Sequence, residues 1–235
     1  MVSLWTASLD LPSSLLTPLM ATLSEPERTR AARFHFARDH DRFIAGRGLL
    51  RRLLGRHLAM PPEQIRLMTG PNGKPELDPA FHPGDLTFNL SHSENRALFG
   101  LTYGRRIGVD IERVRPNIEI ETLAERFFAP GETAALMALP EAQRVPAFFA
   151  CWTRKEAYLK ALGEGIGFGL DRFEVSLTPD APPALLSTAF DPEEAMRWTL
   201  YSLDVSSDFA AAVVIEGSPC PLILHSLSDS WFSDL

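Results

Sequence analysis

The chain has 235 residues and a formal net charge of −7, and 45% of its residues are hydrophobic while 23% are charged. These values are ordinary for a soluble globular protein with one large core or two small ones. The sequence contains no apolar run of the roughly 18 residues that a membrane-spanning helix needs, which excludes a span of that kind.

The two cysteines, Cys151 and Cys220, are too few for a disulfide framework and lack the spacing of metal ligands. The N-terminal segment 1–16 has no basic region followed by a long apolar stretch, so we expect no signal peptide. Both features favour a protein of the reducing cytoplasm.

Positive charge is concentrated in the first quarter of the chain. Residues 1–60 hold nine arginines and five acids, a balance of +4 that leaves −11 for the remainder. The arginines are Arg28, Arg30, Arg33, Arg38, Arg42, Arg47, Arg51, Arg52 and Arg56. A basic segment on an acidic protein suggests a local site for a small polyanion more than a nucleic-acid surface. A solvated helix face explains the same pattern equally well.

In chain order, the first expected element is an edge strand at residues 2–9, where the residues alternate. Apolar residues then recur at helical intervals from 25 to 58, which predicts helix over that range. Two prolines at 61 and 62 break the chain, and a turn follows at 69–77. Three strands are expected next, the first two as a hairpin: 85–93, 96–103 and 106–114.

The second half of the sequence repeats this order. Helical patterns occupy 119–139 and 141–162. Strands are expected at 172–178, 196–203 and 208–215, and irregular structure after them. We therefore expect an α+β fold of two similar subdomains, 1–104 and 105–235, although no residue-level repeat is visible.

The segment Gly-Val-Asp-Ile-Glu at 108–112 places two carboxylates on one face of a strand. Alternation directs Asp110 and Glu112 to one side, while Val109 and Ile111 point to the core. Carboxylates about 7 Å apart repel each other unless a cation lies between them, and Mg²⁺ suits such oxygen ligands. The alternative is a solvent-exposed strand face paired with neighbouring arginines.

Two further segments suggest anion contacts. In Asn-Leu-Ser-His-Ser at 89–93, Ser91 and His92 lie where a strand gives way to a turn, so a hydroxyl, an imidazole and backbone amides can meet an anion. A turn stabilised by side-chain to backbone bonds is the alternative. Gly-Lys-Pro at 73–75 places Lys74 on a stiff turn, which by itself is a weak signal.

The segment 151–165, CWTRKEAYLKALGEG, predicts a helix that ends at Gly163. Glu156 lies four residues before Lys160, so the two side chains share a face. A solvated ion pair is the ordinary explanation of this spacing. A chemical role for both residues requires support from the rest of the chain.

The order and spacing of these motifs provide that support. An arginine-rich helix, GKP, FNLSHS, GVDIE, RFFAPGE and WTRKEAYLKALGEG follow one another in a series that resembles the surfactin-type 4'-phosphopantetheinyl transferases over about residues 25–170. The resemblance implies a pseudo-dimer of two α+β halves in one chain, with the active site between them. It also implies an enzyme that uses coenzyme A and Mg²⁺. Such an enzyme moves the phosphopantetheine arm to a serine of an apo acyl or peptidyl carrier protein and releases 3',5'-ADP.

Position by position, the resemblance implies roles for individual residues. Asp110, Glu112 and Glu156 would form the metal site, with Glu156 also the base. Lys160 and His92 would neutralise charge on the transferring group. Contacts to coenzyme A phosphates are implied for Lys74, Ser91, His92, Lys155, Lys160, Arg28 and Arg30.

The expected partners are coenzyme A and an apo carrier protein of fatty-acid, polyketide or nonribosomal-peptide synthesis, with no nucleic acid and no membrane. Because both halves lie in one chain, we expect a cytoplasmic monomer. Two other functions compete with this hypothesis: a non-catalytic carrier-protein or nucleotide-binding module, and a metal-dependent phosphohydrolase.

Overall fold

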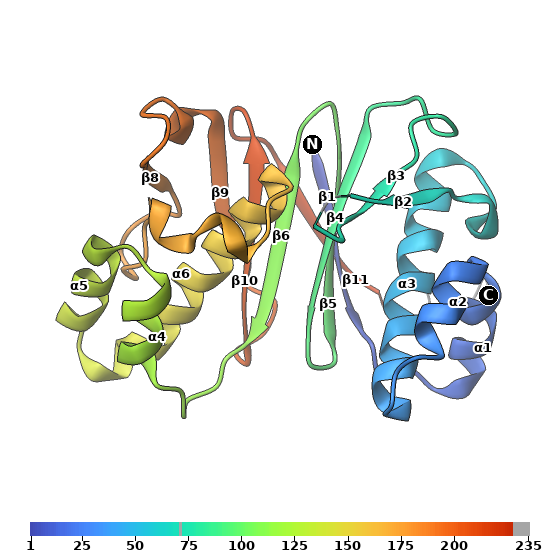
Figure 1. The fold of residues 1–235 in the computed structure, drawn as a ribbon, viewed down its shortest axis with the longest axis horizontal. Coiled ribbons are helices and arrows are strands. Elements are labelled where there is room, and N and C mark those ends of the chain that lie inside the picture. The colour runs from blue at the N-terminus through green and yellow to red at the C-terminus, as the bar shows by residue number, and fades with distance from the viewer. Residues whose placement is uncertain (71, 228–235) are drawn as a thin grey trace.

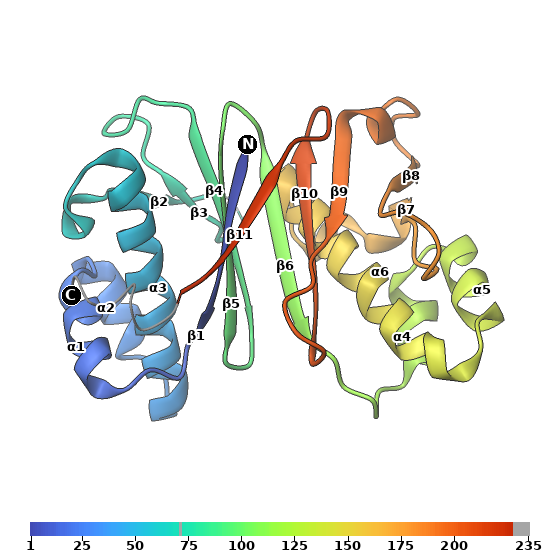
Figure 2. The ribbon, with the colours of Figure 1, turned by 180° about the vertical axis from the view of Figure 1, so that it is seen from behind.

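Two α+β halves lie side by side in the computed structural model, which describes residues 1–70 and 72–227 (Figure 1). Within these residues, the first half contains a four-stranded sheet of order β11-β1-β5-β4, and the second contains a three-stranded sheet of order β6-β10-β9. Helices cover the outer side of each half, and the two sheets face each other at the centre (Figures 1 and 2). The predicted pair of α+β subdomains is confirmed.

The first half combines its sheet with three helices and a small hairpin. Its sheet strands are β1 (Val2–Ser8), β4 (Leu86–Ser93), β5 (Arg96–Tyr103) and β11 (Leu222–Ser226). Its other elements are α1 (Ser13–Ala21), α2 (Glu25–Ala31), α3 (Ala37–Leu58), η1 (Pro62–Gln64), β2 (Leu67–Thr69) and β3 (Pro75–Leu77).

The second half is arranged around one long helix. Its sheet strands are β6 (Ile107–Arg113), β9 (Trp198–Ser202) and β10 (Phe209–Glu216), and β7 (Phe173–Val175) pairs separately with β8 (Leu185–Thr188). Its helices are α4 (Ile120–Phe127), α5 (Pro130–Ala138) and α6 (Glu141–Leu162), with short 3-10 turns η2 (Ile166–Phe168), η3 (Leu170–Arg172) and η4 (Glu194–Arg197). Helix α6 ends where expected, because Gly163 adopts a left-handed conformation with φ of 81°.

The structure corrects several sequence predictions in the first half. The expected helix at 25–58 is two helices, because the chain bends between Ala31 and Ala37. Strand β1 is not an edge strand: it lies between β5, which runs antiparallel to it, and β11, which runs parallel. Alternation along a strand is the same at an edge and inside a sheet, so the pattern did not separate the two cases.

The C-terminal segment also differs from the expectation. Residues 222–226 form β11 and pair with β1, so this strand of the predicted subdomain 105–235 belongs to the sheet of the first half. The division at residue 104 otherwise falls in the turn between β5 and β6. Residues 228–235 of the expected irregular tail lie outside the described residues.

Strand β6 is packed on both faces, and its sequence shows why. Val109 and Ile111 are fully buried in a core between the two sheets, together with Leu4 of β1 and Val213 of β10. On the opposite face, a Cβ at Gly108 would lie only 1.9 Å from the Ala157 carbonyl oxygen of α6. Glycine therefore permits β6 to lie directly against α6, and Asp110 and Glu112 point to that same side.

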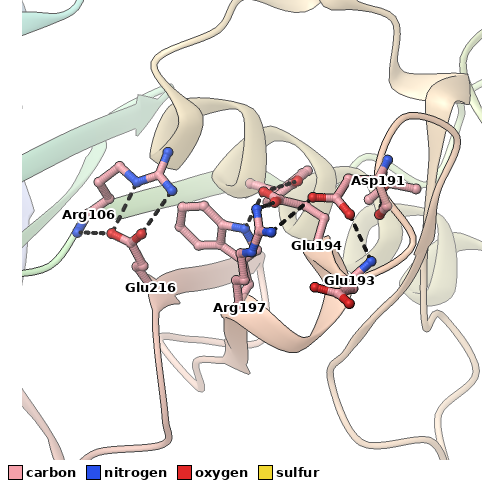
Figure 3. Close-up of polar contacts among 9 residues, drawn as sticks. Arg106, Asp191, Glu193, Glu194, Arg197 and Glu216 are labelled. Atoms are coloured by element: carbon pink, nitrogen blue, oxygen red, sulfur yellow. Dashed lines mark hydrogen bonds and ion pairs between the residues drawn. The ribbon is translucent and has the colours of Figure 1, made fainter.

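A buried carboxylate attaches the outer side of α6 to the rest of the second half (Figure 3). Glu194 of η4 is 6% exposed, and its Oε1 accepts hydrogen bonds from the Tyr158 hydroxyl at 3.1 Å and the Trp198 indole at 2.7 Å. Its Oε2 pairs with Arg197 at 2.9 Å. Close by, Arg106 pairs with Glu216 and lies 4.6 Å from the Trp198 ring (Figure 3). These contacts connect α6, β9 and the start of β6.

The contacts of Glu194 predict its effect on stability. Glu194→Ala leaves the buried Tyr158 and Trp198 donors without an acceptor, and we expect the free energy of unfolding to fall by about 1–3 kcal/mol. Glu194→Gln keeps an acceptor oxygen and should lose less than half of that amount. Urea unfolding of the two variants and the parent measures both values. Equal stability of the alanine variant and the parent would contradict this role.

Candidate active site

A cavity of about 780 Å³ lies between the two halves, as expected for the active site. The first half contributes residues from α3, from the turn 72–75 and from β4, while the second half contributes the C-terminal part of α6. Among the predicted residues, it is lined by Arg30, Lys74, Ser91, His92, Glu156 and Lys160. A second hollow of about 720 Å³ beside α2 shares Arg30 and Phe34 with it.

Carboxylates of β6 and α6 meet beside this cavity. Asp110 is 2% exposed, and its Oδ1 accepts hydrogen bonds from the Ser91 hydroxyl at 2.7 Å and the Lys160 amine at 2.6 Å. Oε2 of Glu112 accepts one from the Ser93 hydroxyl at 2.7 Å. Oδ2 of Asp110 and Oε1 of Glu156 are buried and have no hydrogen-bond partner. An unsatisfied buried carboxylate oxygen is costly unless a cation reaches it.

These carboxylates suit a hard divalent cation. Mg²⁺ takes carboxylate oxygens together with waters and substrate phosphates, so two protein oxygens without donors fit its needs. Within the described residues, no group of three or more acidic, histidine or cysteine side chains is already in metal-binding geometry. The Lys160 ammonium on Asp110 is the positive charge that the structure places among them.

The contact between Lys160 and Asp110 changes the interpretation of helix α6. In the solvated-pair hypothesis, the amine of Lys160 lies on Glu156 at the surface. Its hydrogen bonds are instead with Asp110 and Ser91, and Glu156 is partly buried against the cavity. The solvated-pair hypothesis for these two residues is therefore wrong.

Crowding of the carboxylates changes their proton affinity. Withdrawal from water raises the pKa of Glu156 to about 7, the charges of Asp110 and Glu112 add to the increase, and Lys160 opposes it. Burial is also the main reason that the pKa of Glu112 is raised, although the Ser93 hydrogen bond lowers it. The metal-free site therefore retains protons at pH values where ordinary carboxyl groups have lost them.

This proton affinity predicts how the metal-free protein responds to pH. Because the pKa of Glu156 is higher in the folded chain than in the unfolded chain, its contribution to stability is present below about pH 4.5 and is lost as the pH rises through 7. We expect Glu156→Gln to be more stable than the parent by about 1–3 kcal/mol at about pH 8 and to differ little at about pH 5. Urea unfolding with a chelator at both pH values measures this, and a pH-independent difference would contradict it.

The turn that carries Lys74 is attached to the end of α6. The Lys74 amine donates to the Lys160 carbonyl at 2.8 Å, and the Asn72 amide donates to the Gly163 carbonyl at 2.9 Å. Both contacts satisfy carbonyl groups at the negative end of the helix. Burial is the main cause of the lowered pKa of Lys74. A lysine of the first half is thus placed beside the C-terminal end of a helix in the second half.

His92 lies at the end of β4 and lines the cavity. Withdrawal from water lowers the pKa of its imidazole first, and the charges of Lys160 and Arg42 lower it further. The ring therefore favours its neutral form at neutral pH.

Only some arginines of the arginine-rich segment line the cavity. Those that line it are Arg30, Arg38, Arg42 and Arg47, together with Phe34 and Phe43. The guanidinium groups of Arg30 and Arg47 lie 5.4 and 5.8 Å from the Phe43 ring. This arrangement gives the first half an aromatic surface surrounded by positive charge.

Two predicted contacts do not reach the cavity. The Lys155 side chain is fully buried, and its amine contacts the Glu132 carboxylate at 2.6 Å and the Leu170 carbonyl at 2.7 Å. The Arg28 guanidinium donates to the Leu23 carbonyl, in the turn just before its own helix. Neither Lys155 nor Arg28 is among the residues that line the cavity, so the structure gives no support to their predicted contacts with coenzyme A.

Sequence reasoning also missed residues that belong to the site. Ser93 bonds to Glu112, and Asn89, which lines the cavity, accepts the Val109 amide at 2.8 Å. The strand alternation at 85–93 already placed both on the same face as Ser91. The sequence did not reveal which part of the chain that face would meet.

Two family models match the chain: one described as 4'-phosphopantetheinyl transferase, N-terminal, over residues 8–99, and one described as 4'-phosphopantetheinyl transferase superfamily, over residues 106–214. The chain is 44% identical to the 4'-phosphopantetheinyl transferase HetI of a Nostoc species, over 92% of this chain and 88% of that protein. It is 36% identical to psf-1 of Bacillus pumilus over 88% of both. It is 32% identical to Sfp of Bacillus subtilis over 68% of this chain and 69% of that protein.

Solved structures resemble part of the chain. The holo-[acyl-carrier-protein] synthase of Thermotoga maritima matches 48% of this chain and 63% of its own, with 25% identity and a TM-score of 0.38. The Helicobacter pylori synthase in complex with coenzyme A matches 47% of this chain and 99% of its own, with 25% identity and a TM-score of 0.34.

The matches across both halves show that the chain belongs to the 4'-phosphopantetheinyl transferase superfamily. It is an enzyme that transfers the 4'-phosphopantetheine arm of coenzyme A to an apo carrier protein. The two competing functions, a non-catalytic binding module and a phosphohydrolase, are set aside by this membership.

Proposed function

We propose that the transfer takes place in the cavity between the halves and depends on Mg²⁺ held by Asp110, Glu112 and Glu156. The observation that carries this proposal is the pair of buried, donor-free oxygens on Asp110 and Glu156 beside a wall of cationic side chains. When bound, Mg²⁺ supplies positive charge that neutralises the pyrophosphate of coenzyme A. The residues of the chain then have to orient the substrate, accept one proton and stabilise the leaving group.

The first half is suited to hold the phosphates. Coenzyme A carries a pyrophosphate and a 3'-phosphate, which need several positive donors. Lys74, His92 and Lys160 line the cavity near the carboxylates, and Ser91 adds a hydroxyl. Arg30 lies against Phe43 on the far wall, where an adenine ring and a phosphate can be bound together. We retain Arg30 for this role and assign none to Arg28 or Lys155.

The transfer requires one bond to form and one to break. The hydroxyl oxygen of the carrier serine attacks the phosphorus that bears the pantetheine arm, and the bond from this phosphorus to the bridging pyrophosphate oxygen breaks. Glu156 accepts the hydroxyl proton, directly or through a water molecule. The leaving group is 3',5'-ADP; the Lys160 ammonium neutralises the charge that develops on it, and the His92 imidazole donates a hydrogen bond to it.

The biological setting follows from the same site. The cavity is built from both halves of one chain, which supports a monomeric enzyme. We assign it to the cytoplasm, with an acyl or peptidyl carrier protein of fatty-acid, polyketide or nonribosomal-peptide synthesis as the acceptor. In the described part of the chain, no helix is both long enough and apolar enough to cross a bilayer.

The metal assignment predicts the effect of one substitution. Asp110→Asn removes a charged ligand while keeping the side chain's size, and we expect the rate of carrier loading to fall about 100-fold or more. Intact-mass analysis of an apo carrier incubated with coenzyme A and Mg²⁺ measures the rate. Asp204→Asn, at an exposed aspartate of the same half, is the control and should load at the parent's rate. Near-parental loading by a folded Asp110→Asn protein would refute the metal site.

The placement of the arginines predicts a contrast between two neighbours on α2. Arg30→Ala removes a cation from the cavity wall, and we expect coenzyme A to bind about 10- to 100-fold more weakly. Arg28→Ala removes a side chain that bonds to the turn before its own helix, so the affinity should change less than about threefold. Calorimetric titration of both variants with coenzyme A tests the contrast. If Arg28→Ala weakens binding more than Arg30→Ala, the proposed wall is wrong.

A further inference from the structure

Side chains of β4 and β6 join the two halves where the sheets face each other. β4 is the last strand of the first sheet, and β6 is the first strand of the second. Asn89 accepts the Val109 amide, Ser91 donates to Asp110, and Ser93 donates to Glu112. Alternate residues of β4 share a face, as do alternate residues of β6. Two serines two positions apart therefore meet two carboxylates two positions apart.

The direction of each serine hydrogen bond is fixed by its other partner. The Ser93 hydroxyl oxygen accepts the backbone amide of Arg113 at 3.1 Å, so its single proton is free for Glu112. The Ser91 hydroxyl oxygen accepts the Lys160 ammonium at 2.9 Å, and an ammonium group only donates. The proton of Ser91 is therefore directed to Asp110. Both hydroxyls are polarised in the same sense, from the first half toward a carboxylate of the second.

In each of these carboxylates, one particular oxygen accepts the hydrogen bonds that come from β4. Ser91 and Lys160 occupy Oδ1 of Asp110, and Oδ2 is the buried oxygen without a donor. Ser93 occupies Oε2 of Glu112. Hydrogen bonds to the second oxygen of a carboxylate orient it as a metal ligand, and their removal typically weakens metal binding by about 10- to 100-fold.

We propose that Ser93 is a positioning residue that orients Glu112 toward the metal, as Ser91 orients Asp110. The proposal rests on the metal site proposed above, and it assigns to Ser93 a role that a purely structural hydroxyl does not have. A structural hydroxyl would affect only the joint between the halves, that is, the hydrogen bonds from β4 to residues of the second half. A positioning hydroxyl affects metal affinity.

Thr87 provides a matched comparison for these two roles. It lies on the same face of β4, and its hydroxyl donates across the joint to the Arg105 carbonyl at 2.5 Å. It does not contact the carboxylates in the described hydrogen bonds. Thr87→Val therefore removes a hydroxyl from the same joint without touching a metal ligand. Ser93→Thr keeps the hydroxyl at position 93 and suits a strand.

The test measures Mn²⁺ binding to the full chain with coenzyme A present, by the paramagnetic resonance of free Mn²⁺. We expect Ser93→Ala to bind Mn²⁺ about 10- to 100-fold more weakly, and Ser93→Thr and Thr87→Val to stay within about threefold of the parent. In carrier loading, the half-saturating Mg²⁺ concentration of Ser93→Ala should rise by the same factor, while kcat at saturating Mg²⁺ stays within about threefold. Melting temperatures confirm folding, and Ser93→Cys replaces Ser93→Ala if the latter does not fold.

The outcomes separate this proposal from the one on which it rests. Parental Mn²⁺ affinity in Ser93→Ala, or an equal loss in Thr87→Val, overturns the positioning role and leaves the metal site intact. The Mn²⁺ affinity measured with Asp110→Asn is the baseline, because it reports the Mn²⁺ that coenzyme A binds without help from the metal site. If the parent binds Mn²⁺ no more tightly than that baseline, the metal site itself is refuted.

Discussion

The repulsion among three carboxylates at the centre of the molecule is the constraint around which this fold is arranged. Asp110, Glu112 and Glu156 converge because β6 lies directly on α6, and Gly108 is the residue that permits this approach. Burial withdraws these carboxylates from the water that would screen their charges, so their mutual repulsion has to be opposed from within the protein. Lys160 and the two serines oppose this repulsion in the metal-free protein, and burial still raises the pKa of both Glu112 and Glu156.

The two halves have complementary roles. The first contributes arginines and aromatic rings to the cavity lining, and the second contributes the carboxylates of β6 and α6. Neither half contains a complete site. The turn that carries Lys74 satisfies the end of α6, and β4 satisfies carboxylates of β6, so the contacts that shape the site are also contacts between the halves.

Much of the site could be predicted from the sequence where the chemistry followed local periodicity. Strand alternation placed Asp110 and Glu112 together, and helical spacing placed Glu156 beside Lys160. Lys155 was placed by motif resemblance, and periodicity argued against it: five residues from Lys160, it lies about 140° away around the helix. In the same way, Arg28 and Arg30 are two residues apart on α2, so their side chains leave the helix in directions that differ by about 200°.

Local sequence patterns could not predict contacts between distant segments of the chain. Ser93 carries no signal of its own, because its role exists only where β4 meets a strand that the sequence places elsewhere. The bend after Ala31 and the return of β11 were missed for a related reason. Both depend on which surface the chain packs against, and β11 is mostly exposed, with no alternation of buried and exposed residues.

Because β11 returns to the first sheet, the two halves are not independent modules that follow one another along the chain. The last described strand leaves the second half and pairs with β1, so both ends of the described chain lie in one sheet. A chain cut at Gly104 would have β1 and β11, which are neighbours in one sheet, on different fragments. The enzyme should therefore unfold as one cooperative unit.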